Sequence, residues 1–182
     1  MQCPTHRLVP QGQDGPEFSR IVAGVWRIAQ WNMSAQERLR YIEQNLELGV
    51  TTFDHADIYG DYGAESLFGE ALALRPELRG KMQLVSKCGI RVMSGQRPEI
   101  GLPHYDTGGA HILASAERTL RNLRTEVLDV LLIHRPDPLM DFDEIAEAFT
   151  TLRRQGKVKY FGVSNFTPSQ FAGLSSRIPL GG

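Results

Sequence analysis

Short apolar runs alternate with amphipathic stretches along most of this chain, and this alternation strongly limits the folds open to it. Runs typical of strands cover residues 50–53, 82–86, 128–133 and 160–163. Apolar residues at helical spacing lie between them, at about 65–74, 112–123 and 142–154. Strands that alternate with helices in this way predict β/α units around a parallel sheet. We therefore expect an α/β fold.

A β-hairpin is predicted before these units. Its first arm covers residues 6–9, and 12–15 supply the turn residues. A second extended stretch covers 18–24. From about Ile21 onwards it is either the returning arm or the first strand of the main sheet, and we favour the main sheet because the parallel-type pattern follows.

Helix start and stop signals support the same reading. Ser34 and Glu37 have the spacing of a capping box, and Gly49 is a natural stop for the helix that follows. Thr167-Pro168 predicts the start of a last helix. The stretch 90–109, which contains glycine and proline, is expected to be a long loop.

The sequence lacks a G-x-G-x-x-G fingerprint and a phosphate-binding P-loop, so a doubly wound dinucleotide domain is disfavoured. A (β/α)8 barrel of the TIM type places catalysis at the carboxyl ends of its strands, where Asp54, Lys87, His134 and Ser164 all fall. About five β/α units fit this chain, whereas a closed barrel needs eight and typically ~250 residues. We predict that residues 1–182 form one domain, a TIM-type barrel truncated after about five units.

Composition excludes several classes of partner. The 182 residues are 41% hydrophobic, enough for a sizeable core, and the net charge is −1 from 20 basic and 21 acidic residues. Such a balance favours neither nucleic acid nor an anionic membrane. No signal peptide or apolar run of ~18 residues is visible, so a cytoplasmic protein is expected. Cys3 and Cys88 fit no metal-ligand spacing and are expected to be free thiols, with no metal site.

The residues at the strand ends suit proton transfer. Tyr59 is the best candidate for a general acid, although a free phenol titrates near ~10. The ammonium of Lys87 beside it would stabilise the phenolate, and Asp54 would hold that ammonium by a charge-assisted hydrogen bond. His134 would orient a substrate oxygen. These groups together predict proton delivery to a carbonyl while a hydride reaches its carbon.

Each of these residues also has a structural interpretation. Tyr59 fits a packed aromatic, His134 a structural histidine, and Asp54 with Lys87 an ordinary ion pair. Ser164 and Asn165 fit a helix-capping turn. The recurrence of such residues at the ends of consecutive strands favours catalysis.

Four motifs, in order, resemble those of the aldo-keto reductase family. They are Phe53-Asp54-His55-Ala56-Asp57-Ile58-Tyr59-Gly60, Val85-Ser86-Lys87, Leu132-Ile133-His134-Arg135-Pro136 and Gly162-Val163-Ser164-Asn165-Phe166. The resemblance extends over nearly the whole chain, from the predicted hairpin to Phe166.

The resemblance implies a role for each residue. It implies that Tyr59 is the proton donor, that Lys87 and Asp54 tune it, and that His134 orients the carbonyl. Ser164 and Asn165 match positions that hydrogen-bond the nicotinamide carboxamide of the cofactor, and Trp26 matches a site-lining position. The implied reaction is reversible NADP-dependent reduction of a small aldehyde or ketone to an alcohol.

The family also continues beyond the motifs seen here. Its members have three more strands, which supply a nicotinamide-stacking aromatic and the basic site for the 2′-phosphate. This polypeptide alone is therefore expected to bind NADPH weakly or not at all. The sequence does not decide the oligomeric state.

Two other functions compete with carbonyl reduction. The first is a catalytically silent, reductase-like module that binds or regulates other chains. The second is a lyase or aldolase with Lys87 as a Schiff-base nucleophile, which a neighbouring Asp54 disfavours because it keeps the lysine protonated.

Overall fold

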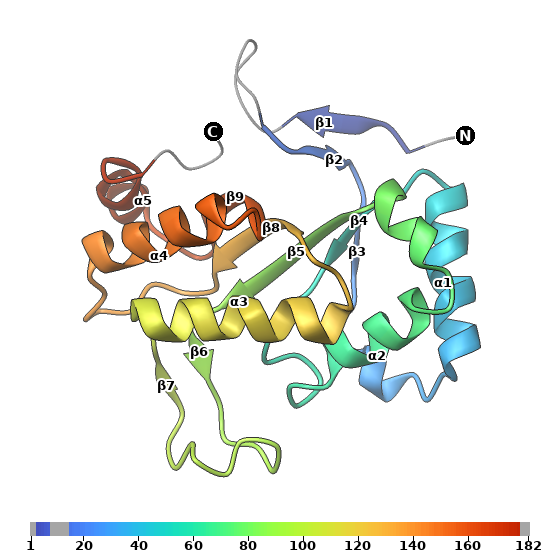
Figure 1. Cartoon of the computed structure of the whole chain (residues 1–182), viewed down its shortest axis with the longest axis horizontal. Helices are drawn as coiled ribbons and strands as arrows, with labels where there is room; N and C mark the ends of the chain where they lie inside the picture. Colours follow the sequence, from blue (N-terminus) through green and yellow to red (C-terminus); the bar gives the residue numbers. More distant parts are fainter. Residues whose placement is uncertain (1–2, 8–14, 179–182) are drawn as a thin grey trace.

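A five-stranded parallel sheet forms the centre of the molecule (Figure 1). The computed structural model describes residues 3–7 and 15–178. The sheet order is β3-β4-β5-β8-β9, and every neighbouring pair is parallel. The strands are β3 (Val22–Gly24), β4 (Thr52–Asp54), β5 (Gln83–Cys88), β8 (Leu128–Ile133) and β9 (Val158–Val163). The predicted α/β fold with a parallel sheet is confirmed.

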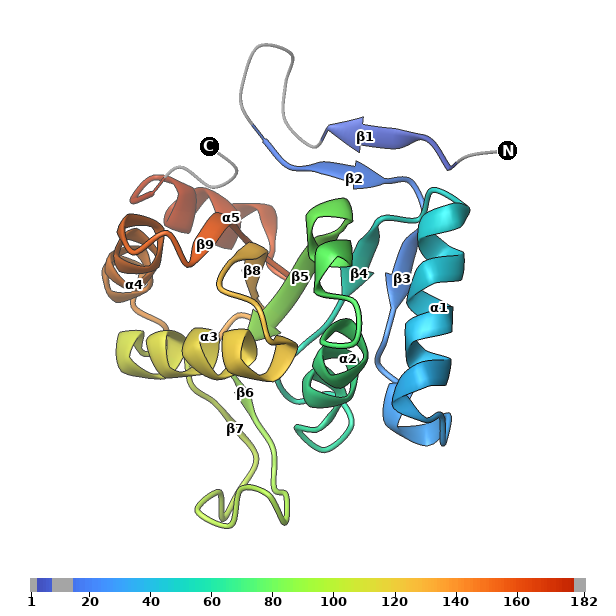
Figure 2. The same ribbon diagram turned by 45° about the vertical axis from the view of Figure 1, so that its right-hand side comes forward.

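A helix follows each strand of the sheet. The helices are α1 (Ala35–Glu47), α2 (Ala64–Leu72), α3 (Gly109–Leu123), α4 (Phe142–Arg154) and α5 (Pro168–Ser175), with short 3-10 helices η1 (Ile28–Gln30) and η2 (Pro76–Lys81). Each packs on the next helix in chain order, as Figure 2 shows. Between strands and helices lies the core, in which Phe53, Phe68, Leu84, Leu131 and Phe149 are fully buried. Burial of such side chains contributes roughly 1.5–3 kcal/mol each.

Local signals in the sequence account for the helix ends. Ser34 caps α1: its hydroxyl accepts from the Glu37 backbone, and the Glu37 carboxylate accepts from the Ser34 N–H. Gly49 ends the turn after α1 with φ of +79°, and a Cβ there would lie 2.8 Å from the Cys3 nitrogen. Only glycine meets both demands without strain. Thr167 caps α5 in the same way as Ser34 caps α1.

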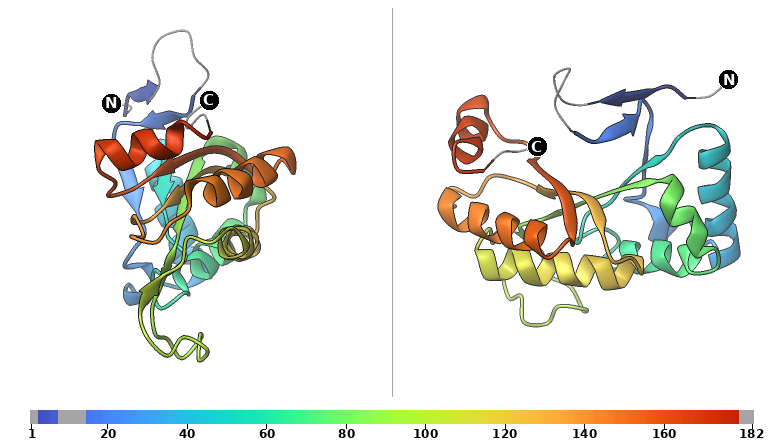
Figure 3. Two further views of the ribbon diagram at one scale, coloured as in Figure 1. Left: turned by 90° about the vertical axis from the view of Figure 1, so that its left-hand side faces the viewer. Right: turned by 45° about the horizontal axis from the view of Figure 1, so that its top comes forward.

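The N-terminal hairpin is present and lies at the amino ends of the strands (Figures 1 and 3). Its arms are β1 (Thr5–Arg7) and β2 (Glu17–Ser19), paired antiparallel. Residues 8–9 of the predicted first arm and 12–14 of the predicted turn lie outside the described residues. The stretch from Ile21 leads into β3, so the choice of the main sheet is confirmed.

One prediction needs correction. The stretch 90–109 is not simply a loop, because it contains a small antiparallel sheet of β6 (Ile90–Arg91) and β7 (His104–Tyr105). Strands of two residues are too short to leave a periodic pattern in the sequence. Figure 1 shows this hairpin at the end of the sheet opposite to β1 and β2.

The strand and helix bounds also differ by a few residues from the prediction. β5 continues through Cys88, so Lys87 lies inside its strand, and Asp54 is the last residue of β4. α3 begins at Gly109, three residues earlier than predicted. These shifts are the usual uncertainty at element ends.

Candidate active site

The predicted site residues come from four neighbouring strands of the sheet. Asp54 ends β4, and Lys87 lies near the end of β5. His134 directly follows β8, and Ser164 directly follows β9. Because the strands are parallel and in order, their carboxyl ends bring these residues to one rim.

The Lys87 ammonium is the centre of the polar contacts at this rim. It donates to the Asp54 carboxylate at 2.7 Å, to the His55 carbonyl at 2.8 Å and to the Tyr59 hydroxyl at 3.2 Å. An ammonium has three hydrogens, so all of them have acceptors. Lys87 is only 7% exposed, and these three contacts hold its ammonium in one position.

Tyr59 lies between two other aromatic rings. Its ring centroid is 6.3 Å from that of Trp26 and 5.9 Å from that of His134, the latter edge-on at 81°. The Tyr59 backbone N–H donates to the Ala56 carbonyl at 3.1 Å, which closes a tight turn after β4. The Tyr59 ring therefore lies near the His134 ring, and its hydroxyl accepts from the Lys87 ammonium. Trp26 is 61% exposed and borders this region.

His134 is held as a neutral imidazole. Burial, followed by the charges of Lys87 and Arg135, lowers the pKa of His134 from 6.5 to about 4. Its backbone N–H donates to the Cys88 carbonyl at 2.8 Å, whereas its buried Nδ1 has no hydrogen-bond partner among the described residues. A neutral imidazole has one donor and one acceptor nitrogen, so the ring can still make a hydrogen bond to a ligand.

Ser164 and Asn165 lie beside His134 at the end of β9. The Ser164 N–H donates to the Ile133 carbonyl at 2.8 Å. The Asn165 amide donates to the His134 carbonyl at 3.1 Å and to the Ser164 hydroxyl at 2.8 Å. Asn165 has φ of +63°, a left-handed conformation that asparagine tolerates. A hydroxyl and an amide at one rim are a donor and acceptor set that fits a carboxamide.

A second layer of polar residues lies behind Lys87 and was not identified from the sequence. Asp57, on the segment between Asp54 and Tyr59, accepts a hydrogen bond from Ser115 of α3 at 2.6 Å. Burial raises the pKa of Asp57 to about 7, while the bond from Ser115 opposes that rise. Glu65 of α2 accepts from Ser86 of β5 at 2.7 Å, and burial raises the pKa of Glu65 as well.

The sequence does hold a signal for this layer. Ser115 and Thr119 lie one turn apart on the face of α3 that also carries Ile112 and Ala116, and all four are buried. Polar residues inside an apolar helical stripe are candidates for buried hydrogen bonds. The partners of these residues depend on tertiary packing, which a single sequence does not give.

Other kinds of site find little support in the part of the chain that the structure describes. Within residues 3–7 and 15–178, no group of three or more His, Cys, Asp or Glu side chains is arranged to hold a metal ion. Over the same ranges, no helix has the length and apolar character needed to cross a membrane. Cys3 and Cys88 are free cysteines, as expected.

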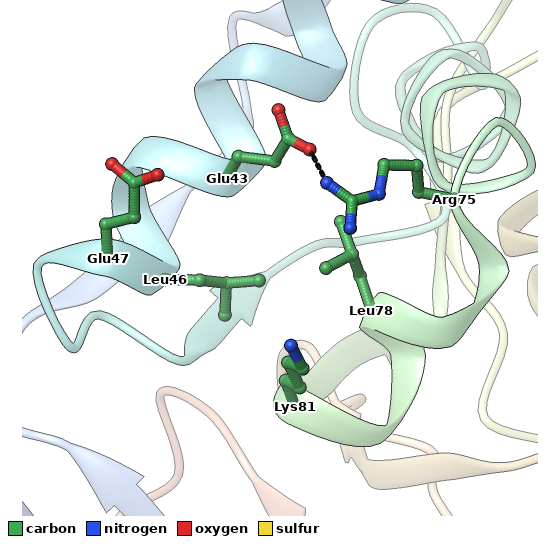
Figure 4. A pocket seen from close by; sticks show the side chains of 6 residues that line it. All are labelled: Glu43, Leu46, Glu47, Arg75, Leu78 and Lys81. Carbon is green, nitrogen blue, oxygen red and sulfur yellow. Dashed lines mark hydrogen bonds and ion pairs between the residues drawn. The ribbon is translucent and has the colours of Figure 1, made fainter.

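A surface groove of about 400 Å³ lies between α1 and η2 (Figure 4). It is lined by Glu43, Leu46, Glu47, Arg75, Leu78 and Lys81. An ion pair between Glu43 and Arg75 spans it. Because α1 and η2 lead into the amino ends of β4 and β5, this groove is not part of the strand-end site.

The sequence model of the aldo/keto reductase family matches residues 20–180. The chain belongs to the aldo/keto reductase family. The oxidoreductase YdhF of Escherichia coli strain K12 is 59% identical over 173 residues, which cover 95% of this chain and 56% of that protein. A 6-dehydroglucose reductase of Agrobacterium fabrum is 46% identical over 164 residues, covering 90% of this chain and 55% of that protein.

A solved structure gives the same result for the fold. The glycerol dehydrogenase of Gluconobacter oxydans matches with a TM-score of 0.81 and 31% identity, covering 100% of this chain and 54% of that one. The family resemblance noted in the sequence and the TIM-type barrel fold are thus confirmed. The chain spans about half the length of the curated relatives it matches. Its parallel sheet is consistent with a truncated barrel.

The curated relatives named above bear the names of oxidoreductases, YdhF and a 6-dehydroglucose reductase.

Proposed function

We propose that this chain carries the proton-transfer apparatus of an NADP-dependent reductase of aldehydes or ketones. The observation that carries the proposal is the Lys87 ammonium, which bonds to Asp54 at 2.7 Å and to the Tyr59 hydroxyl at 3.2 Å. In the proposed reaction the Tyr59 hydroxyl gives its proton to the carbonyl oxygen. The phenolate that remains is stabilised by the adjacent ammonium.

His134 is proposed to orient the carbonyl. A neutral imidazole at this rim can donate a hydrogen bond to the same oxygen that receives the proton of Tyr59, without competing as an acid. The lowered pKa of His134, about 4, supports this assignment because the ring stays neutral near pH 7.

Ser164 and Asn165 are proposed to hold the nicotinamide carboxamide. Their hydroxyl and amide groups lie beside His134, on the rim that carries Tyr59. NADPH, when bound, supplies the hydride that the carbonyl carbon receives. Trp26, exposed and close to Tyr59, would cover one side of the substrate. Preference for NADP over NAD is part of the proposal and rests on the family resemblance.

The substrate is proposed to be a small carbonyl compound, in the cytoplasm, with no nucleic acid or membrane as partner. The names of two relatives, a 6-dehydroglucose reductase and a glycerol dehydrogenase, suggest a hydroxylated substrate as the first to test. We further propose that residues 1–182 behave as one domain.

The alternative candidate function is a silent, reductase-like module that binds or regulates other chains. A Schiff-base lyase has less support, because every hydrogen of the Lys87 ammonium is donated and the charged form has no free lone pair.

The test compares this polypeptide with a version extended by the C-terminal part of YdhF. NADPH oxidation is followed by absorbance with 6-dehydroglucose and a panel of simple aldehydes, and NADPH binding is followed by nicotinamide fluorescence. We expect turnover in the extended protein and weak or no NADPH binding by the 182-residue chain. An extended protein that folds and binds NADPH but reduces no carbonyl would contradict the reductase function.

A further inference from the structure

The segment that carries Tyr59 continues along β5 beyond the end of β4. The His55 N–H donates to the Val85 carbonyl at 2.8 Å, and the Asp57 N–H donates to the Lys87 carbonyl at 3.0 Å. The backbone of Asp57 is therefore bound to the same residue whose ammonium contacts Tyr59. Two residues later the chain reaches Tyr59.

The side chain of Asp57 binds this segment to a different element. It is 3% exposed, and its Oδ2 accepts from the Ser115 hydroxyl at 2.6 Å. Arg118, one turn further along α3, approaches the same oxygen at 3.9 Å. A buried carboxylate costs free energy, so a position that keeps one needs a compensating reason.

We propose that Asp57 and Ser115 are positioning residues, whose hydrogen bond fastens the Asp54–Tyr59 segment to α3 and thereby fixes the Tyr59 hydroxyl against the Lys87 ammonium. The chain of contacts is continuous. α3 holds Ser115, Ser115 holds Asp57, Asp57 is bonded to the backbone of Lys87, and the turn from Ala56 to Tyr59 places the phenol. The role of Tyr59 as proton donor rests on the proposed function, whereas the experiment that tests the positioning of Tyr59 does not.

A matched contact in the same layer serves as control. The Ser86 hydroxyl donates to the buried Glu65 at 2.7 Å, so it is also a serine bonded to a buried carboxylate. This bond joins β5 to α2 and does not involve the Asp54–Tyr59 segment. Removing either hydroxyl costs a similar hydrogen bond, but only the Ser115 bond holds Tyr59 in place.

The experiment measures how fast the backbone N–H groups of Asp57 and Tyr59 exchange with deuterium in the full 182-residue chain, followed residue by residue by NMR. In the structure these groups donate to the carbonyls of Lys87 and Ala56. No turnover is needed, so the result does not depend on whether the chain is an active reductase.

We expect Ser115→Ala and Asp57→Ala to speed exchange of the Asp57 and Tyr59 N–H groups about tenfold, because the segment loses its hydrogen bond to α3. Asp57→Asn keeps an oxygen that accepts from Ser115 and should leave both exchange rates close to those of the wild type. Ser86→Ala should lower the melting temperature by about as much as Ser115→Ala, with both exchange rates unchanged.

The two serine variants separate positioning from a general loss of stability. A general loss would speed exchange of the Asp57 and Tyr59 N–H groups equally in Ser115→Ala and Ser86→Ala. Equal acceleration in the two variants, or unchanged rates in Ser115→Ala, would overturn the proposal. If Asp57→Ala does not fold, Ser115→Ala with its Ser86→Ala control decides the question.

Discussion

The two ends of the sheet each hold a buried carboxylate, yet they use it differently. At the amino end, Asp129 is 6% exposed and both of its oxygens are bonded: to Arg79 at 2.7 Å, to Lys159 at 2.8 Å and to the Leu84 N–H at 2.9 Å. At the carboxyl end, Asp57 is 3% exposed. Among the described residues its Oδ2 accepts from Ser115 at 2.6 Å, with Arg118 at 3.9 Å, whereas its buried Oδ1 has no hydrogen-bond partner.

The same contrast extends to the neighbouring groups. Ser19 at the amino end accepts from the N–H groups of Thr51 and Thr52 and donates to the Ile21 carbonyl, so its hydrogen bonds join β2 to β4. At the carboxyl end, His134 keeps a buried Nδ1 without a partner among the described residues. In the part of the chain that the structure describes, these polar side chains are thus more completely hydrogen-bonded at the amino end than at the carboxyl end.

The largest expected effect concerns Tyr59. In the extended, active protein, Tyr59→Phe should lower turnover by about 10³-fold, since the general acid is lost. Its folding and NADPH affinity should stay similar, because the ring remains. Turnover is measured by NADPH oxidation, with Tyr41→Phe on α1 as the control. Unchanged turnover in Tyr59→Phe would rule out this tyrosine as the acid.

Replacing each of the two buried aspartates by asparagine should change the free energy of unfolding at pH 8 in opposite directions. Burial raises the pKa of Asp57 to about 7. Ionisation of this carboxyl group therefore lowers the free energy of unfolding as the pH rises from about 4 to about 7. Asp57→Asn should therefore be more stable than the wild type at pH 8 by about 4 kcal/mol and close to it near pH 4. Urea unfolding at both pH values measures this. A variant that is less stable at pH 8 would show that the Asp57 charge is needed for folding.

The variant Asp129→Asn tests the amino end of the sheet, where both oxygens of the buried carboxylate are hydrogen-bonded. It should lower the free energy of unfolding at pH 8 by about 2 kcal/mol, because Arg79 and Lys159 lose a shared partner. Lys159 is half exposed, which keeps the loss modest. Turnover per folded molecule in the extended protein should not change. A gain in stability here would remove the contrast between the two ends.

The last prediction concerns His55, which is fully buried, with its ring centroid 4.6 Å from that of Phe68. Burial, followed by the charge of Lys87, lowers the pKa of His55 to about 3. Its unfolded form takes up a proton below about 6.5, so stability is lost as the pH falls from there towards 3. His55→Leu should flatten the decline of unfolding free energy between pH 6 and pH 4 by about 1 kcal/mol per pH unit.

The measurement for His55 is a series of urea titrations across that pH range. The exposed His104 offers a matched variant, His104→Leu, which removes a histidine from the surface of β7. If both variants flatten the decline equally, burial of His55 is not its cause.

Much of the fold followed from local patterns. The capping box at Ser34, the apolar run 128–133 and the helix 142–154 were predicted within their observed bounds, because each depends on neighbouring residues alone. The β6–β7 hairpin was missed, since two-residue strands have no period to detect. The residues of the proposed site were named because the sequence predicted each of them at or just after the end of a strand, although β5 continues one residue beyond Lys87.

What the sequence by itself determined is the alternation of strands and helices, and the polar side chains at the strand ends that we propose for proton transfer. What only the tertiary structure decided is how those side chains are held. Asp57 and Ser115 are 58 positions apart in sequence, and the 2.6 Å bond between them exists only because α3 packs behind β5. Local spacing sets which face a residue occupies, but partners across that distance are chosen by the packing of whole elements.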